Sequence, residues 1–387
     1  MQTGHTVKIV AKKILNRIKH LFYSRVYRNP ANFIRTLKDL IETGDWNLDN
    51  FSIQDGNIQI EGWAVVPDRK PQQFSFTLND LEFAKVEYPL PGARPDLKKH
   101  FWYMPNAKDC GFNCRISTGE KINLSGNDLT IKFVHKNSGE PLNPRQNYYY
   151  RKGFAQLPLP EPHRRMRVHG SDHLDSFLIE GYSTFKKVEL ALEELSGKTY
   201  ADFSNILDWG CGCGRITRHF NDLKNSRITG IDVDEDNARW CQENLPFGSF
   251  HVVPLTPPTS LEEASFDLIV GISIFTHLNE EAQYDWLQEL NRLAKRDAYL
   301  LVTVSGMNTV ARMGTYYPIY RALIDKGFLD LGHNPGLDSV LADIQYYRNT
   351  LHTSEYIYQN WSRHFRILAI IPGTIGNHQD LVIMQKE

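Results

Sequence analysis

Three glycines at alternate positions, Gly210, Gly212 and Gly214, constrain the fold of this 387-residue chain more than any other feature. They follow residues 206–209, which have the composition of a buried strand, and a helical pattern comes after them. Glycine lets a backbone approach a ligand that side chains would exclude, and a helix N-terminus offers free N–H donors. A strand, a glycine-rich turn and a helix in this order predict a ligand-binding loop in an α/β sheet.

The residues around this loop narrow the class of ligand. A nicotinamide-dinucleotide fingerprint would need a third glycine at position 215, where the chain has Arg215. Asp208 precedes the first glycine by two residues and suits a ligand with a cationic amino-acid end. Asp232 ends the next predicted strand, where a carboxylate can accept hydrogen bonds from both ribose hydroxyls. Adenosine joined to an aminoacyl group is therefore the implied ligand, and a tight turn that binds no ligand is the alternative.

These residues resemble the motifs of class I S-adenosylmethionine-dependent methyltransferases, in particular the bacterial type 11 and type 12 groups. The first motif matches Asp208 to Gly214, the second matches Gly230-Ile231-Asp232, and residues 265–270 are similar to the fourth-strand motif. The resemblance covers about residues 165–387 and implies S-adenosyl-L-methionine as cofactor. It also implies a Rossmann-like seven-stranded sheet with strand order 3-2-1-4-5-7-6, in agreement with the alternation of strand-like and helix-like segments after residue 205.

The resemblance implies a set of cofactor-binding residues. They are Asp208, Gly210, Cys211, Gly212, Gly214, Asp232, Val233, Leu255, Ser273 and Gly181. Leu255 lies in the stretch where many relatives carry an acid that meets the adenine amino group. Residues 271–274 lack the Asn/Asp-Pro-Pro-aromatic motif of amino-methylating DNA enzymes, which disfavours a nucleic-acid acceptor.

Two histidines are the candidate catalytic residues. Methyl transfer from a sulfonium needs alignment and exclusion of water, and a hydroxyl acceptor also needs a base. His277 follows the predicted fourth strand, and His352 lies between the fifth and sixth strands, where this architecture usually forms the acceptor pocket. Packing or helix capping is the alternative role for each. Four tyrosines are candidates for the pocket wall, or else belong to the core: Tyr316, Tyr317, Tyr346 and Tyr347.

The first half of the chain has a different character. Residues 1–45 are predicted to form a basic amphipathic helical segment, because the first 38 residues hold nine Lys/Arg and no Asp or Glu. Such a helix suits an anionic membrane surface, and it could instead pack on the protein or on a second subunit. Residues 50–150 read as short strands and predict a separate β-sandwich-like domain. Residues 151–165 form a proline-rich linker, and residues 166–387 form the methyltransferase domain.

Short motifs in the β domain indicate the chemical class of the methyl acceptor. Glu61-Gly62-Trp63, Arg94-Pro95-Asp96 and Cys110-Gly111-Phe112 resemble a module fused to some bacterial glycosyltransferases. The prediction is therefore methyl transfer to a hydroxyl of a glycan, a glycolipid or a small metabolite. The alternative is a catalytically inactive glycan-binding or scaffold protein. The cysteine spacing predicts no metal site.

Composition sets the outer limits of these predictions. The net charge of −1 excludes a globally basic nucleic-acid binder, and no apolar run is long enough for a transmembrane helix. Five cysteines in 387 residues favour a reducing cytoplasm over a disulfide scaffold. We therefore expect a cytoplasmic protein that contacts the inner membrane face if its basic helix binds lipid.

Overall fold

The chain divides into two compact units, which we describe separately. The computed structural model describes residues 31–54, 57–66, 73–79, 81–82, 92–117, 128–151, 153, 156–313 and 316–387. Unit 1 comprises Met1–Lys152 and Met307–Tyr320, and unit 2 comprises Gly153–Gly306 and Arg321–Glu387. The predicted basic helix within residues 1–28 lies outside the described residues.

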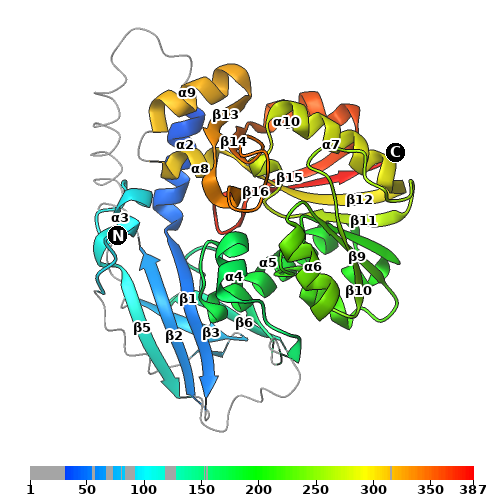
Figure 1. Ribbon diagram of the computed structural model, residues 1–387. Coiled ribbons are helices and arrows are strands. Elements are labelled where there is room, and N and C mark those ends of the chain that lie inside the picture. Colours follow the sequence, from blue (N-terminus) through cyan, green and yellow to red (C-terminus); the bar gives the residue numbers. More distant parts are fainter. Residues whose placement is uncertain are drawn as a thin grey trace. The chain divides into compact units, whose positions relative to one another are not determined.

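A mixed seven-stranded sheet forms the centre of unit 2 and confirms the predicted α/β class (Figure 1). Its strands lie in the order β10 (Gly248–Val252), β9 (Arg227–Asp232), β8 (Asn205–Trp209), β11 (Phe266–Gly271), β12 (Ala294–Ser305), β16 (Gln379–Gln385) and β15 (Arg366–Ile375). The first five are parallel, and β16 runs antiparallel to both of its neighbours. The next strand in the chain after β8 is β9, which lies on one side of β8, whereas the later strand β11 lies on its other side. Ligands of doubly wound folds bind where the strand order reverses in this way.

Helices cover both sides of this sheet. Figure 1 shows α5 (Leu174–Ser196) and α6 (Glu235–Asn244) on one side, with α7 (Glu280–Leu293) and α10 (Ser354–Asn360) on the other. Side-chain caps fix where two of them begin, because Asp234 accepts from the third residue of α6 and Asn279 does the same for α7. Helix α5 ends at Gly197, which has a left-handed backbone.

Aromatic rings fill the core beneath the carboxyl ends of the central strands. Trp209 at the end of β8 packs against Phe275 and Trp286, with ring centroids 4.9 and 5.2 Å apart. Phe275 in turn lies 4.5 Å from Trp361, which is fully buried. This packing anchors the segment after β11 and α7 to the strand that carries the glycine loop.

A long insertion separates β12 from β15. It contains α8 (Met307–Arg312), α9 (Tyr316–Lys326), and an antiparallel pair formed by β13 (Phe328–His333) and β14 (Arg348–His352). This hairpin was not predicted from the sequence. The loop joining its strands carries Leu337, Tyr346 and Tyr347, which matter for the site described below.

Unit 1 contains two antiparallel sheets. One has the order β1 (Asp45–Gln54), β2 (Asn57–Val65), β5 (Gly111–Ser117), and the other β4 (Leu81–Glu82), β3 (Phe74–Leu78), β6 (Leu129–His135), β7 (Tyr148–Tyr150). Trp46 of β1 is fully buried and packs within 6 Å of Phe76, Phe133 and Tyr148, which belong to the other sheet.

Part of the insertion belongs to unit 1. Helix α8 packs against α2 (Ala31–Thr43). Arg312 pairs with the buried Asp45, and the Trp102 indole donates to the Ala311 carbonyl at 3.0 Å. A segment from beyond residue 300 is therefore structurally part of the N-terminal unit.

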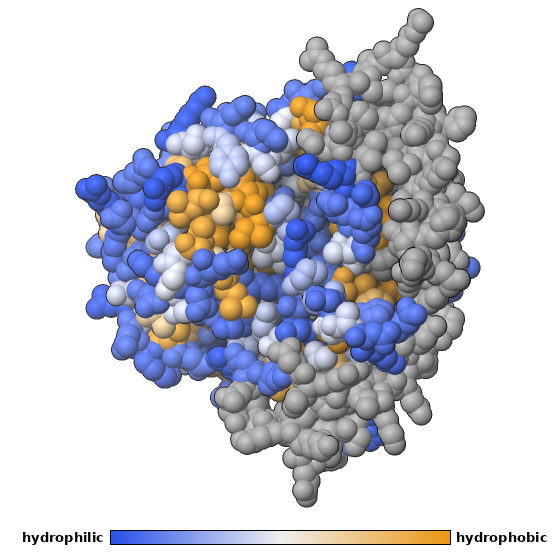
Figure 2. Space-filling model, turned by 180° about the vertical axis from the view of Figure 1, so that it is seen from behind, coloured by the Kyte–Doolittle hydropathy of each residue, from blue (hydrophilic) through white to orange (hydrophobic). Residues whose placement is uncertain are grey.

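The surface of the described residues is mainly hydrophilic on the face drawn in Figure 2, where apolar side chains gather in one larger area. Among the described helices, none is both long and apolar enough to cross a membrane. The same residues contain no group of three or more His, Cys, Asp or Glu side chains that could hold a metal ion.

Candidate functional site

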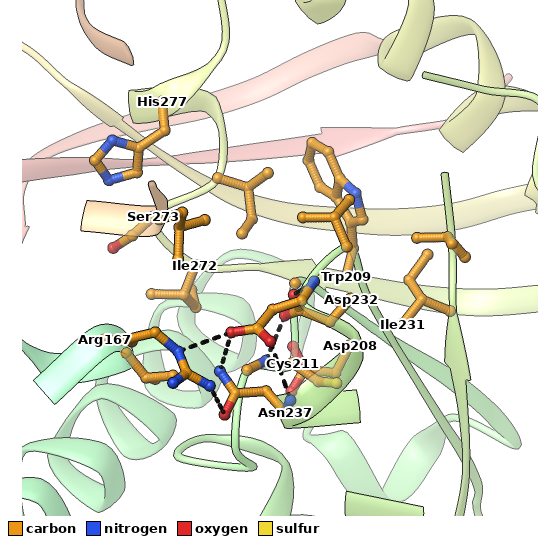
Figure 3. Close-up of a pocket in the computed structure, with 18 of the residues that line it drawn as sticks. Arg167, Asp208, Trp209, Cys211, Ile231, Asp232, Asn237, Ile272, Ser273 and His277 are labelled. Carbon is orange, nitrogen blue, oxygen red and sulfur yellow. Dashed lines mark hydrogen bonds and ion pairs between the residues drawn. The ribbon is translucent and has the colours of Figure 1, made fainter. Parts of the chain in front are cut away.

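A pocket lies in unit 2 at the carboxyl ends of β8, β9 and β11, where the strand order reverses. Figure 3 shows His277 and Ser273 at one end of the drawn residues and Asp208 and Asn237 at the other. Its walls come from the glycine loop, the segment after β11, helix α4 (Pro162–His169) and the loop between β13 and β14.

The glycine loop has a backbone that only glycine adopts at low cost. Gly210, Gly212 and Gly214 have φ of 76°, 53° and 75°. A Cβ on Gly210 would lie 2.0 Å from Ile274 Cδ1, and one on Gly212 would lie 2.8 Å from Val168 Cγ2. The N–H groups of residues 210 and 211 both donate to the Ile231 carbonyl, at 2.8 and 3.0 Å. The loop is therefore held against β9 and is closely packed on both sides.

Two carboxylates line the pocket, of which Asp208 is buried and Asp232 is half-buried. Asp232 accepts from the N–H of Gly212 at 2.6 Å and from that of Asp234 at 2.8 Å, one bond to each oxygen. Each oxygen keeps a lone pair for a further donor. Asp208 is 2 % exposed and accepts from the Thr217 hydroxyl. Burial raises the pKa of Asp208 to about 7 and that of Asp232 to about 6.

Arg215 places a cation beside these carboxylates. It lines the pocket, its Nε has no hydrogen-bond partner, and none of the ion pairs formed by the described residues involves it. Burial lowers its pKa, and the nearby charges of Glu180 and Asp208 oppose that shift. A guanidinium held without a close counter-ion is suited to bind an anionic group of a ligand. From the sequence alone, Arg215 was a reason to disfavour a dinucleotide and was not expected to bind a ligand.

Helix α4 forms one wall and was not predicted. Arg167 pairs with Asp234 at 3.0 Å and with Asp236 at 2.6 Å, so it ties α4 to the start of α6. Asp234 is 2 % exposed and also caps α6. The positive charge of Arg167 balances the buried negative charge of this carboxylate. This contact holds Val168 against Gly212. The proline-rich segment before residue 166 thus leads directly into the site.

The other end of the pocket carries His277. Its Nδ1 lies 2.8 Å from the Arg348 carbonyl, which can only accept, so Nδ1 bears the proton and Nε2 has a free lone pair. The ring stacks on Tyr347 with centroids 4.1 Å apart. Burial lowers the pKa of His277 to about 4, which keeps the imidazole neutral. Ser273 beside it has a φ of 63°, and its hydroxyl lies 3.0 Å from Gln379 Oε1.

The pocket brings together most of the residues expected from the sequence. Asp208, Gly210, Cys211, Gly212, Asp232, Val233, Ser273 and His277 all line it. The remaining three cofactor candidates are not among the residues that line it. Gly214 packs against Leu245, Gly181 packs against the backbone of Arg215, and the carbonyl of Leu255 accepts from the Trp286 indole at 3.1 Å.

His352 does not lie in the pocket, which corrects its assignment as a candidate base. It is 1 % exposed, and its Nε2 lies 2.9 Å from Gln283 Oε1. The ring packs between Phe328 and Trp361, at 5.2 and 5.6 Å. The register of β14 turns this side chain into the core, so it supports the insertion and cannot meet an acceptor.

Similarity to known proteins agrees with this geometry. Residues 206–297 match the methyltransferase domain family. Two curated relatives match about a quarter of the chain each. The ribosomal protein L11 methyltransferase of Thermotoga maritima is 29% identical over 101 residues, which are 26% of this chain and 36% of that protein. The O-antigen chain terminator bifunctional methyltransferase/kinase WbdD of Escherichia coli is 33% identical over 98 residues, which are 24% of this chain and 13% of that protein. The chain thus spans well under half the length of these relatives.

Solved structures give a more distant likeness. A methyltransferase from Methanosarcina mazei is 21% identical, covers 47% of this chain and 92% of its own, and has a TM-score of 0.35. The 1,6-didemethyltoxoflavin-N1-methyltransferase of Burkholderia thailandensis is 18% identical, covers 63% of this chain and 96% of its own, and has a TM-score of 0.37.

Proposed function

We propose that this chain binds S-adenosyl-L-methionine and transfers its methyl group to a hydroxyl oxygen of a glycan, a glycolipid or a small metabolite. The single observation that carries the proposal is the pocket itself, which combines a glycine loop, a ribose-type carboxylate and a histidine with a free nitrogen. The match of residues 206–297 to the methyltransferase domain family supports the same reading.

The residues of the pocket fit the parts of this cofactor. Asp232 would accept from the two ribose hydroxyls with the lone pairs that its backbone bonds leave free. Asp208 would face the ammonium of the methionine end, and Arg215 would pair with its carboxylate. Val233 and Leu278 offer apolar surface for the adenine ring. When bound, the sulfonium supplies an activated methyl group, so the chain's own task is alignment and exclusion of water.

His277 would act as the base for the acceptor hydroxyl. A neutral imidazole with Nε2 unprotonated can take a proton as the oxygen attacks. The hydrogen bond from Nδ1 to the Arg348 carbonyl and the stack on Tyr347 hold the ring in this state. A hydroxyl is a poor nucleophile without such help, whereas a neutral amine needs less assistance.

The β unit and one relative both favour a glycan as the acceptor. Unit 1 carries the short motifs that resemble a module of bacterial glycosyltransferases, which favours a glycan. WbdD is named as an O-antigen chain terminator, which supports the same class. The Thermotoga relative is named for a ribosomal protein, so a protein acceptor is the competing outcome of the test.

The test follows labelled methyl groups. The full chain is incubated with methyl-labelled S-adenosyl-L-methionine and a bacterial extract separated into glycolipid, small-molecule and protein fractions. We expect label in the glycolipid or small-molecule fraction, as a methyl ether on oxygen. Label on protein, or on nitrogen or carbon, would overturn the acceptor proposal.

A variant tests the base. His277→Ala should lose roughly 10²–10⁴ in turnover, because it removes general-base catalysis. Its affinity for S-adenosylhomocysteine should stay near that of the wild type. His251→Ala, an exposed histidine on β10, is the matched control and should keep full turnover. If His277→Ala retains wild-type turnover, alignment alone carries the reaction and the histidine has no chemical role.

A further inference from the structure

The adenine end of the pocket lacks the acid that the resemblance would place after the third strand, and a different group lies there. The indole Nε1 of Trp286 donates both to the Leu255 carbonyl at 3.1 Å and to the Tyr346 hydroxyl at 3.0 Å. Leu255 belongs to the stretch that follows β10. The Tyr346 hydroxyl therefore lies beside the backbone where the resemblance expects contact with the adenine edge.

The direction of this hydrogen bond leaves Tyr346 with a proton to donate. An indole N–H is only a donor, so the tyrosine oxygen must be the acceptor in its bond with Trp286. The hydroxyl hydrogen points elsewhere, and no described residue accepts it. Tyr346 and Trp286 both line the pocket, so the hydroxyl has a proton that it can donate to a ligand bound there.

The surroundings keep this hydroxyl protonated and in place. Burial raises the pKa of Tyr346 to about 12, so the group remains a donor at any physiological pH. Trp286 is 1 % exposed and packs on Trp209, the last residue of β8, which directly precedes the glycine loop. The tyrosine comes from the β13–β14 loop, and it is positioned by a side chain that is itself part of the core.

We propose that the Tyr346 hydroxyl donates a hydrogen bond to a ring nitrogen of adenine and so takes the role of the missing acid in selecting the base. The chemistry fits, because adenine offers acceptor nitrogens at N1, N3 and N7. This inference rests on the proposed function. It adds that the insertion between β12 and β15 helps to bind the cofactor and does not serve the acceptor alone.

The test compares the wild type with one variant for their affinity toward the ligand and a set of its analogues. Calorimetry measures S-adenosylhomocysteine and its 1-deaza, 3-deaza and 7-deaza analogues against the wild type and against Tyr346→Phe. We expect Tyr346→Phe to bind S-adenosylhomocysteine about 3- to 10-fold more weakly, the range of one neutral hydrogen bond. For one deaza analogue the two proteins should bind alike, because the acceptor nitrogen is already absent. Tyr358→Phe, an exposed tyrosine on α10, is the control and should match the wild type.

The outcomes separate this inference from the function on which it rests. If Tyr346→Phe binds S-adenosylhomocysteine as tightly as the wild type, the inference is wrong although the cofactor site stands. If the variant loses the same factor against all four compounds, Tyr346 only packs against the ligand and the inference is also wrong. If the wild type binds none of them, the proposed function itself fails.

Discussion

At the scale of single residues, Arg215 gives a prediction that tests the orientation of the ligand. Arg215→Gln should weaken S-adenosylhomocysteine binding about 10-fold or more, because the variant loses a charge-assisted bond to the carboxylate. It should leave binding of 5′-methylthioadenosine within about 2-fold, since that compound has no carboxylate. Titration calorimetry with both compounds measures the difference. Arg239→Gln on the surface of α6 is the control. Equal losses for both compounds would place Arg215 away from the amino-acid end.

The carboxylates Asp208 and Asp232 predict a pH dependence. Their pKa values are raised to about 7 and about 6, so the ligand-free protein holds protons that the unfolded chain releases. The stability of the ligand-free protein should therefore fall as pH rises from about 4 to 7. Hydroxyl and ammonium donors of the ligand favour the ionised carboxylates. The charge of Arg215 acts in the same direction on Asp208, whereas the negative charge of Asp234 opposes the ionisation of Asp232. Binding should thus release protons.

The affinity for S-adenosylhomocysteine should rise at least about 10-fold between pH 5 and pH 8, which corresponds to one carboxylate that must ionise. Calorimetry in two buffers of different ionisation enthalpy counts the protons released. Asp232→Asn removes one titrating group and should flatten the profile. A profile that is level in the wild type, or one that falls with pH, would show that the ligand does not engage these carboxylates.

At the scale of secondary-structure elements, the sequence predicted what is local and periodic. The strands at 206–209, 227–232 and 266–272 agree with β8, β9 and β11 within about two residues, because each is a short apolar run bounded by turns. The glycine loop and Asp232 could be placed together from sequence alone. Neighbouring parallel strands end at the same edge of a sheet, so a carboxylate at the end of β9 must lie near the loop after β8.

Elements that depend on distant packing could not be predicted. Helix α4 has no apolar stripe, since its sequence PHRRMRVH is mostly basic, and its place follows from the pairing of Arg167 with Asp234 and Asp236. His277 and His352 looked equivalent in the sequence. The difference between them is the register of β14, which turns one ring into the core while the other stays in the pocket.

At the scale of the whole molecule, the chain combines one unit whose seven-stranded sheet carries the pocket with a separate β unit. The insertion between β12 and β15 contributes α8 to unit 1 and the β13–β14 loop to the pocket of unit 2. The sequence does not reveal this division, because it depends on the distant segments against which each part of the insertion packs. A methyl acceptor carried by a glycan or a glycolipid would give the β unit a role in recognition.

The central claim is that the pocket of unit 2 binds the adenosyl cofactor, and titration of the full chain with S-adenosylhomocysteine tests it most directly. We expect a dissociation constant in the micromolar range or below for the wild type. Asp232→Ala should weaken binding by about 1.5–3 kcal/mol, the scale of a lost charged hydrogen bond. Glu243→Ala, an exposed acid on α6, should bind like the wild type. No heat with the folded wild type, or equal affinity for Asp232→Ala, would contradict the account.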